Sequence, residues 1–218
     1  MKLRAALIAL PFLVAACGNA SSQTDNGAAT APAGDKTEIL ATDMVLGDPN
    51  APVTLIEYAS VTCPHCAVFN EQVMPDVKEK FIATGKIKLV FREFPTAPAN
   101  FAVAGSVLAR CAAEKSGPEA YFLITDALFR GQHNWIKENP TSELVKIVSQ
   151  AGMDEAALKT CLQRQDFANI INENAKGAME KYNISGTPQF ILNGEKMVYK
   201  SKEDFEQLLA DAVEKAGA

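Results

Sequence analysis

The chain has 218 residues, of which 48% are hydrophobic, and a formal net charge of −5. This suits one globular domain of ordinary size with a substantial core. Its basic residues form no long run, so a nucleic acid is not an expected partner. Five cysteines are too few for a small scaffold built mainly from disulfides.

The first segment has the pattern of an export signal. Lys2 and Arg4 precede an apolar run from Ala5 to Ala16, which is too short to span a bilayer but suits the core of a signal peptide. The run ends in Leu-Val-Ala-Ala before Cys17, like the cleavage box of bacterial lipoproteins, in which the cysteine becomes the lipidated first residue. Cleavage by the ordinary signal peptidase is the alternative.

A polar stretch follows the export signal. It is rich in Gly, Ala, Ser, Thr and Asn and predicts a flexible linker. We therefore expect a lipoprotein-type signal peptide over residues 1–17, a linker over 18–40 and a globular domain over 41–218. The linker is too short and too polar to be a dimerisation domain, so we expect a periplasmic monomer that touches a membrane only through its lipid.

The globular part begins with strands and one helix. Residues 44–46 suit a short strand, and residues 53–59 are almost all apolar, as in a strand covered on both faces. A helical pattern runs over about 64–84, and another strand follows at 87–94. These elements make a strand–helix–strand unit.

The middle of the chain has no strand signal. It predicts a loop over 131–139 and an all-helical insertion over about 97–165. The helices are expected at about 99–115, 118–130, 141–151 and 154–182.

The last part predicts a β-hairpin and a helix. Strands at 189–192 and 196–199 flank an Asn-Gly turn, which is a strong hairpin signal. Ser201 is placed to cap a final helix that runs to about Lys215.

Two cysteines, Cys63 and Cys66, lie at the junction between the strand predicted to be buried and the helix that follows it. A zinc site needs four ligands and this CxxC stands alone, so we expect no metal; an inert structural disulfide is the other alternative. A redox pair explains more, because the start of a helix stabilises a thiolate and Pro64 suits the first helical position. His65 would add positive charge or a hydrogen bond. Cys63 is then the exposed, acidic thiol and Cys66 the resolving one, with no further cofactor.

The chain resembles the DsbA-type thiol–disulfide oxidoreductases of the bacterial cell envelope. The matching features are CPHC at a strand–helix junction, Gly-Thr-Pro before a strand and a helical block between the two halves. The resemblance covers about residues 42–215 and implies an α/β thioredoxin fold with an all-α insertion. It also implies that Thr187 and Pro188 form a cis-proline loop, which lies against the CxxC and pairs with the substrate backbone.

Glu57 is the single charge in the strand expected to be buried, six residues before Cys63. A carboxylate at a solvent-facing edge is one interpretation. The resemblance favours a buried acid that relays protons for Cys66.

The resemblance implies an exported oxidase that donates its disulfide to newly secreted, cysteine-containing proteins and is reoxidised by a quinone-linked membrane protein of the DsbB type. A disulfide isomerase or reductase is an alternative, because Thr before the cis-proline also occurs in isomerases. A lipid-anchored binding or holdase protein without turnover is a third.

The two remaining cysteines, Cys111 and Cys161, are expected to form a structural disulfide. An oxidising compartment, and an even count once Cys17 is lipidated, favour the bond. Two buried free thiols acting as small hydrophobes are the alternative. His133 and Trp135 are expected in packing or surface roles.

Overall fold

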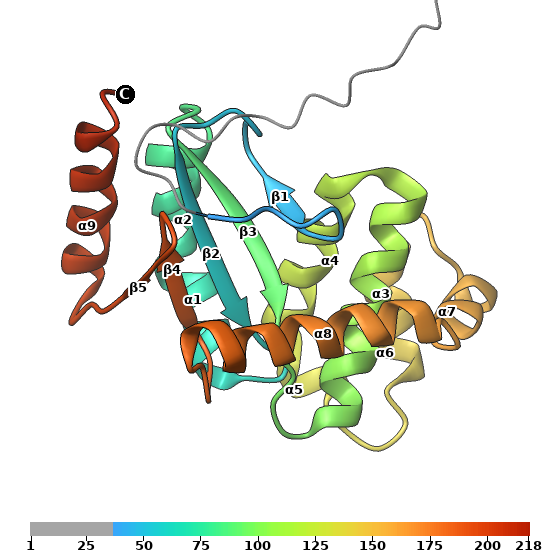
Figure 1. Cartoon of the computed structure of the whole chain (residues 1–218). Helices are drawn as coiled ribbons and strands as arrows, with labels where there is room; N and C mark the ends of the chain where they lie inside the picture. The colour runs from blue at the N-terminus through green and yellow to red at the C-terminus, as the bar shows by residue number, and fades with distance from the viewer. Residues whose placement is uncertain (1–36) are drawn as a thin grey trace, which may run out of the picture.

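Residues 37–218 are described by the structure, a computed structural model, in which a central sheet is surrounded by helices (Figure 1). The predicted signal peptide, Cys17 and most of the predicted linker lie outside the described residues. The elements, in chain order, are β1 (Met44–Leu46), β2 (Val53–Ala59), α1 (Pro64–Gln72), α2 (Met74–Val77), the π-helical segment η1 (Lys78–Ile82), β3 (Ile87–Glu93), α3 (Ala99–Ser116), α4 (Pro118–Arg130), α5 (Gln132–Trp135), α6 (Thr141–Ser149), α7 (Glu155–Cys161), α8 (Gln165–Tyr182), β4 (Gln189–Leu192), β5 (Glu195–Met197) and α9 (Lys202–Lys215). Within residues 37–218, none of the helices is long and apolar enough to cross a membrane.

The five strands form one sheet in the order β1-β3-β2-β4-β5. The central pair, β2 and β3, is parallel, and the other neighbours are antiparallel. All seven residues of β2 are buried, as its apolar sequence predicts. Tyr58 of β2 pairs with Gln189 of β4, so the residues just before β4 lie beside the carboxyl end of β2.

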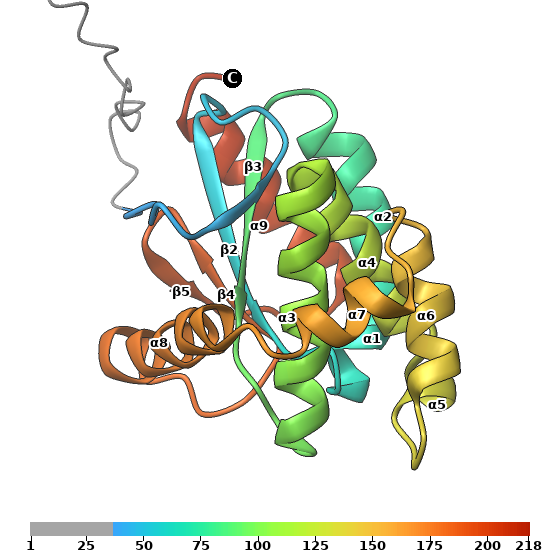
Figure 2. The same ribbon diagram turned by 90° about the vertical axis from the view of Figure 1, so that its right-hand side faces the viewer.

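Helices cover both faces of the sheet (Figure 2). On one face, Ala178 of α8 packs in a cluster with Ile56, Val90 and Ile191 of the sheet. On the other face, α1, α9 and the insertion enclose the larger core, which includes alternate residues of β2 such as Leu55. Because side chains alternate across a strand, Glu57 faces the same side as Leu55, toward α1.

The insertion, α3 to α7, is tied to the sheet by a buried polar network around Glu93. The Glu93 carboxylate accepts two hydrogen bonds of 2.7 Å from Arg110 of α3. Tyr121 of α4 donates to the same carboxylate at 2.8 Å and Asn174 of α8 at 2.7 Å. The network joins β3 to three helices, and its carboxylate is fully hydrogen-bonded, as a buried charge must be.

Several predicted elements are divided in the structure. The helix expected over 64–84 breaks at Val73, because Pro75 has no N–H to continue the ladder. The helix expected over 154–182 is two helices separated by Leu162–Arg164. The loop expected over 131–139 contains α5.

The globular part also begins earlier than predicted. Residues 37–40 were expected to close the flexible linker, yet Thr37 is buried and the Glu38 carbonyl accepts a 2.7 Å hydrogen bond from Arg92 of β3. The same guanidinium pairs with Asp43 at 2.7 Å. These contacts attach the start of the described chain to the sheet.

Candidate active site

The turn between β2 and α1 sets the position of Cys63. The Cys63 N–H donates to the Ser60 carbonyl at 2.9 Å, and Cys63 keeps an extended backbone as the residue that precedes the helix. Pro64 occupies the start of α1, where its missing N–H leaves no bond unmade. The first free N–H groups of the helix therefore point toward the Cys63 side chain.

The two sulfurs differ in accessibility, and both are free thiols. Cys63 is 7% exposed and Cys66 is 0% exposed. Cys63 is less exposed than we predicted because the loop before β4 covers it: its Sγ lies 3.4 Å from the Thr187 carbonyl oxygen. The bond between Thr187 and Pro188 is cis, and the antiparallel pairing of β2 with β4 holds this loop against the CxxC.

The environment moves the two thiol pKa values in opposite directions. A hydrogen bond with the Cys66 side chain, helped by Thr187 and by the backbone N–H groups of Cys66 and His65, lowers the pKa of Cys63 from about 9 to about 5, against the effect of burial. Burial raises the pKa of Cys66 far above its ordinary range, and its hydrogen bond to Cys63 adds to the rise. At neutral pH the geometry favours a Cys63 thiolate beside a Cys66 thiol.

His65 contributes through its backbone rather than through the side-chain hydrogen bond that was one of its two predicted roles. Its side chain is exposed, and within residues 37–218 no side-chain hydrogen bond joins it to Cys63. Its effect on the Cys63 pKa comes through its backbone N–H at the helix start.

Glu57 is 2% exposed, so the interpretation of a solvent-facing carboxylate is wrong. Its Oε1 atom is buried without a hydrogen-bond partner. Burial raises the Glu57 pKa to about 8, with a smaller opposing effect from Lys78 and a reinforcing one from Asp126. Lys78 and Asp126 themselves form an ion pair of 2.8 Å. The Glu57 carboxylate also raises the Cys66 pKa, so the two groups interact electrostatically across the core.

Gln132 is a site residue that the sequence did not reveal. Its side chain, 8% exposed, reaches from α5 and donates to the carbonyls of Val61 at 2.9 Å and of Cys63 at 3.0 Å. These carbonyls belong to the turn that carries the CxxC. The available signal was indirect: Gln132 lies three residues before Trp135, which is 0% exposed and marks this segment as packed.

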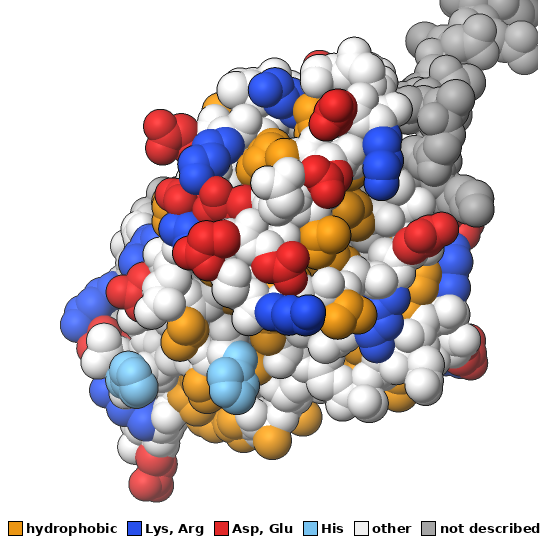
Figure 3. Space-filling view, turned by 90° about the vertical axis from the view of Figure 1, so that its left-hand side faces the viewer, with side chains coloured by type: hydrophobic (Ala, Val, Ile, Leu, Met, Phe, Trp, Pro, Cys, Tyr) orange, Lys and Arg blue, Asp and Glu red, His pale blue; other side chains and the backbone are white. Residues whose placement is uncertain are grey.

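A groove of about 860 Å³ opens beside Cys63, between α1 and the insertion. Figure 3 shows both histidine side chains on one face, with hydrophobic side chains between and below them. His133 lies in the groove lining, whereas Trp135 is core. Further lining residues include Thr62, Pro64, Val68, Pro98 and Phe129.

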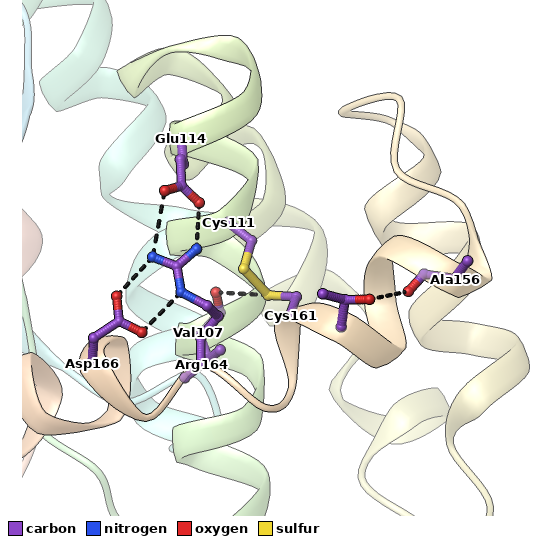
Figure 4. The surroundings of a disulfide bond; sticks show 8 residues. Val107, Cys111, Glu114, Ala156, Cys161, Arg164 and Asp166 are labelled. Carbon is purple, nitrogen blue, oxygen red and sulfur yellow. Dashed lines mark hydrogen bonds and ion pairs between the residues drawn. A yellow bond between two sulfur atoms is a disulfide. The ribbon is translucent and has the colours of Figure 1, made fainter.

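The other cysteine pair lies within the insertion (Figure 4). Cys111 of α3 and Cys161 of α7 are joined with an S–S distance of 2.02 Å. Beside them, Arg164 lies between the carboxylates of Glu114 and Asp166. The structure thus keeps this pair apart from the CxxC.

Comparisons with known proteins agree with this geometry. Residues 40–211 match the family described as Thioredoxin, so the chain belongs to the thioredoxin family. Within that family, its resemblance to the DsbA-type members is confirmed by both sequences and structures.

Two relatives show the likeness in sequence. A Rickettsia bellii protein described as a candidate protein-disulfide oxidoreductase is 33% identical over 153 residues, which are 70% of this chain and 57% of that protein. Disulfide bond formation protein D of Bacillus subtilis is 29% identical over 171 residues, covering 75% of this chain and 72% of that protein. The chain therefore spans little more than half the length of the Rickettsia relative.

Solved structures show the likeness in fold. Alpha-DsbA1 of Wolbachia pipientis superposes with a TM-score of 0.74 at 29% identity, covering 84% of this chain and 96% of that one. BdbD of Bacillus subtilis gives a TM-score of 0.68 at 22% identity, over 79% and 93%, and supports the fold alone. The predicted thioredoxin fold with a helical insertion is thereby confirmed.

Proposed function

We propose that the protein is an exported thiol–disulfide oxidoreductase that oxidises cysteine pairs in newly secreted proteins. The observation that carries this proposal is the asymmetry of the CxxC: Cys63 is slightly accessible with a pKa of about 5, and Cys66 is fully enclosed. A stabilised thiolate stabilises the reduced protein, which makes the disulfide a strong oxidant.

The reaction follows from this asymmetry. A client thiolate attacks Sγ of Cys63 in the oxidised protein, the Cys63–Cys66 bond breaks, and Cys66 leaves as a thiolate that must take up a proton. A second client thiolate then attacks the client sulfur of the mixed disulfide and releases the Cys63 thiolate. The client gains a disulfide, and its two electrons remain on the Cys63–Cys66 dithiol.

Glu57 is the proposed proton donor to the departing Cys66. With its pKa raised to about 8, the carboxyl group is mainly protonated at neutral pH and is poised to give up a proton. In the reverse direction the carboxylate would accept the Cys66 proton. The Thr187–Pro188 loop and the groove beside Cys63 offer a surface for the client polypeptide on two sides of the sulfur.

The cycle needs a reoxidant and a location. A quinone-linked membrane partner of the DsbB type would accept the two electrons, and lipidation of Cys17 would keep the monomer at the bacterial membrane. No metal or cofactor beyond the redox disulfide is part of the proposal. Mass spectrometry of the mature protein tests the anchor: a diacylated N-terminal Cys17 is the expected result, and an unlipidated start beyond it shows ordinary secretion.

The decisive experiment measures whether the protein oxidises client thiols or reduces client disulfides. We expect fast oxidation of a reduced, unfolded client and a reduction potential well above the about −270 mV of thioredoxin, with Cys63→Ser as the inactive control. Fast insulin reduction with a thioredoxin-like potential would favour the reductase, and efficient reshuffling of a scrambled client would favour the isomerase. Client binding that survives in Cys63→Ser, without any turnover in the unaltered protein, would favour a holdase.

A further inference from the structure

The insertion contacts the turn between β2 and α1, which we call the redox turn (residues 60–63), at two points. The Val61 side chain packs against Gly105 of α3, where a Cβ atom would come within 2.9 Å of a Val61 methyl group and 3.2 Å of the Trp135 ring. The Gln132 amide then binds the Val61 carbonyl and the Cys63 carbonyl from α5. The insertion therefore contacts the Val61 side chain of this turn and also binds two of its backbone carbonyls.

We propose that Gln132 is a positioning residue for the redox reaction: its amide donates to the two carbonyls of the redox turn and thereby favours the Cys63 thiolate over the thiol. This inference deepens the proposed function and rests on it. It assigns to the insertion a role in the redox chemistry, in addition to its packing and to its share of the groove lining.

The physical reason lies in the two carbonyls. A carbonyl oxygen carries partial negative charge, and the carbonyl of Cys63 belongs to the residue that bears the thiolate. That oxygen also accepts the N–H of Ala67 at 3.2 Å, so the Gln132 amide adds a second donor to it. In a buried site each donor reduces the repulsion between oxygen and sulfur more than it would in water.

Removal of the Gln132 amide would raise the free energy of the reduced protein more than that of the oxidised protein. The two carbonyls would lose a buried donor in both states. Only the reduced protein carries the negative sulfur beside them, so only there does the electrostatic penalty arise. The expected result is a higher Cys63 pKa and a reduced state that is less favoured.

The test compares Gln132→Met with Trp135→Phe. Methionine keeps the length and approximate shape of glutamine but donates no hydrogen bond. Trp135 lies on the same short helix and donates its indole N–H to the Leu128 carbonyl at 2.8 Å, away from the redox pair. Trp135→Phe therefore removes a buried hydrogen bond from α5 without touching the carbonyls of the redox turn.

We expect Gln132→Met to raise the Cys63 pKa, followed by thiolate absorbance, by about half a pH unit to one pH unit. The equilibrium with glutathione should move three- to tenfold toward the oxidised protein, equivalent to about 15–30 mV. Trp135→Phe should lower the melting temperature and leave both values unchanged. Gln132→Asn, which keeps an amide at shorter reach, should fall between the unaltered protein and Gln132→Met, and it serves also if the methionine variant folds poorly.

Two results overturn the inference. One is an unchanged Cys63 pKa and glutathione equilibrium in both Gln132 variants, with stability losses like that of Trp135→Phe; Gln132 would then be structural only. The other is equal pKa shifts in the Trp135 and Gln132 variants. The unaltered protein separates this failure from that of the proposed function, because an ordinary Cys63 pKa there would refute the oxidase itself.

Discussion

The protein contains two cysteine pairs that differ in almost every physical respect. Cys63 and Cys66 are separated by two residues at the start of α1, whereas Cys111 and Cys161 are separated by 50 positions and join α3 to α7. The first pair is free in the structure and the second is bonded. The same side-chain chemistry therefore meets two different environments in one chain.

Location relative to helix ends explains the contrast. The pKa of Cys63 is lowered by a hydrogen bond with the Cys66 side chain one turn into α1, and by the first N–H groups of that helix, which also favour an anion. Cys111 lies inside α3, and Cys161 is the last residue of α7, at the end where the helix dipole disfavours an anion. Neither position activates a thiolate, which suits a bond that stays closed.

Loop length explains why only the second pair is suited to stabilise the fold. Closing a loop of about 50 residues removes unfolded-state entropy worth about 4 kcal/mol in the chain-entropy model. Closing the short CxxC ring restricts the unfolded chain much less. We therefore expect one pair to exchange electrons and the other to stabilise the fold, and four measurements test this division.

The largest expected effect is on turnover by the CxxC. Cys63→Ser should abolish client oxidation, because the attacked sulfur is gone, and should also remove the stability that the Cys63 thiolate gives the reduced fold at neutral pH. Cys66→Ser should accumulate a mixed disulfide with a disulfide-bonded client, because the Cys63 thiolate attacks that disulfide, one client sulfur leaves as a thiolate, and Cys66 is not there to displace the other. Client oxidation and trapped complexes on non-reducing gels measure both results. Turnover that depends on Cys66 but not on Cys63 would reverse the assigned roles.

Removal of the Cys111–Cys161 disulfide should lower stability and leave client oxidation intact. In Cys111→Ala/Cys161→Ala, we expect the free energy of unfolding to fall by about 4 kcal/mol and client oxidation per folded molecule to persist. Denaturant titration at a temperature where the variant remains folded measures the loss. A variant with unchanged stability and reduced activity would show that the second pair serves the reaction.

The sequence predicted most of the features that depend on local pattern. The strand–helix junction at Cys63, the hairpin around Asn193 and the capped last helix all follow from residues adjacent in the chain. Ser201 indeed caps α9 by accepting the Asp204 N–H at 3.2 Å. The environment of the CxxC could be inferred because proline and the helix start act within a few residues.

Features that depend on distant contacts could not be predicted in the same way. Gln132 acts on carbonyls about 70 positions earlier in the chain, and no local pattern marks it. Glu57 was ambiguous because its burial depends on helices that cover the sheet from elsewhere. The break at Leu162–Arg164 contains neither proline nor glycine, so the helical periodicity continues through it.

The pH dependence of stability should distinguish the redox states. The lowered Cys63 pKa stabilises the reduced fold above about pH 9, and this contribution is lost as the pH falls through about 5. The raised Glu57 pKa acts oppositely: its contribution is present below about 4.5 and is lost as the pH rises through about 8. Between pH 5 and 8 the two groups change the free energy of unfolding of the reduced protein in opposite directions, each by at most about 1.4 kcal/mol per pH unit.

In the oxidised protein only the Glu57 slope remains, because a disulfide does not titrate. We therefore expect the oxidised form to lose stability from pH 5 to 8, the reduced form to stay nearly level, and Glu57→Gln to flatten the oxidised profile. When the reduced protein attacks a disulfide-bonded client, Glu57→Gln should also slow release of the mixed disulfide by Cys66 more than its formation by Cys63. Unfolding titrations at several pH values measure the profiles, and parallel profiles for both redox states would contradict the assigned Cys63 thiolate.

The smallest expected effect concerns the ion pairs around the second cysteine pair. Arg164 bridges Glu114 of α3 and Asp166 of α8, and its guanidinium lies 3.9 Å from the centre of the Phe167 ring. These groups are largely exposed, so solvent and salt screen them, and the disulfide already joins α3 to α7 next to them. Arg164→Ala should therefore lower the melting temperature by only about 1–3 °C.

The same substitution in the Cys111→Ala/Cys161→Ala background tests which contact braces the insertion. Without the disulfide, the Arg164 bridge is the nearest remaining polar tie between α3 and the start of α8, so its loss should lower the melting temperature further than in the unaltered protein. High salt should reduce the effect in both backgrounds, because exposed ion pairs are screened. Equal losses of melting temperature in the two backgrounds would mean that the disulfide and the ion pairs act independently. If Arg164→Ala alone lowered the melting temperature as much as removal of the disulfide does, Arg164 would be the main stabilising contact of the insertion.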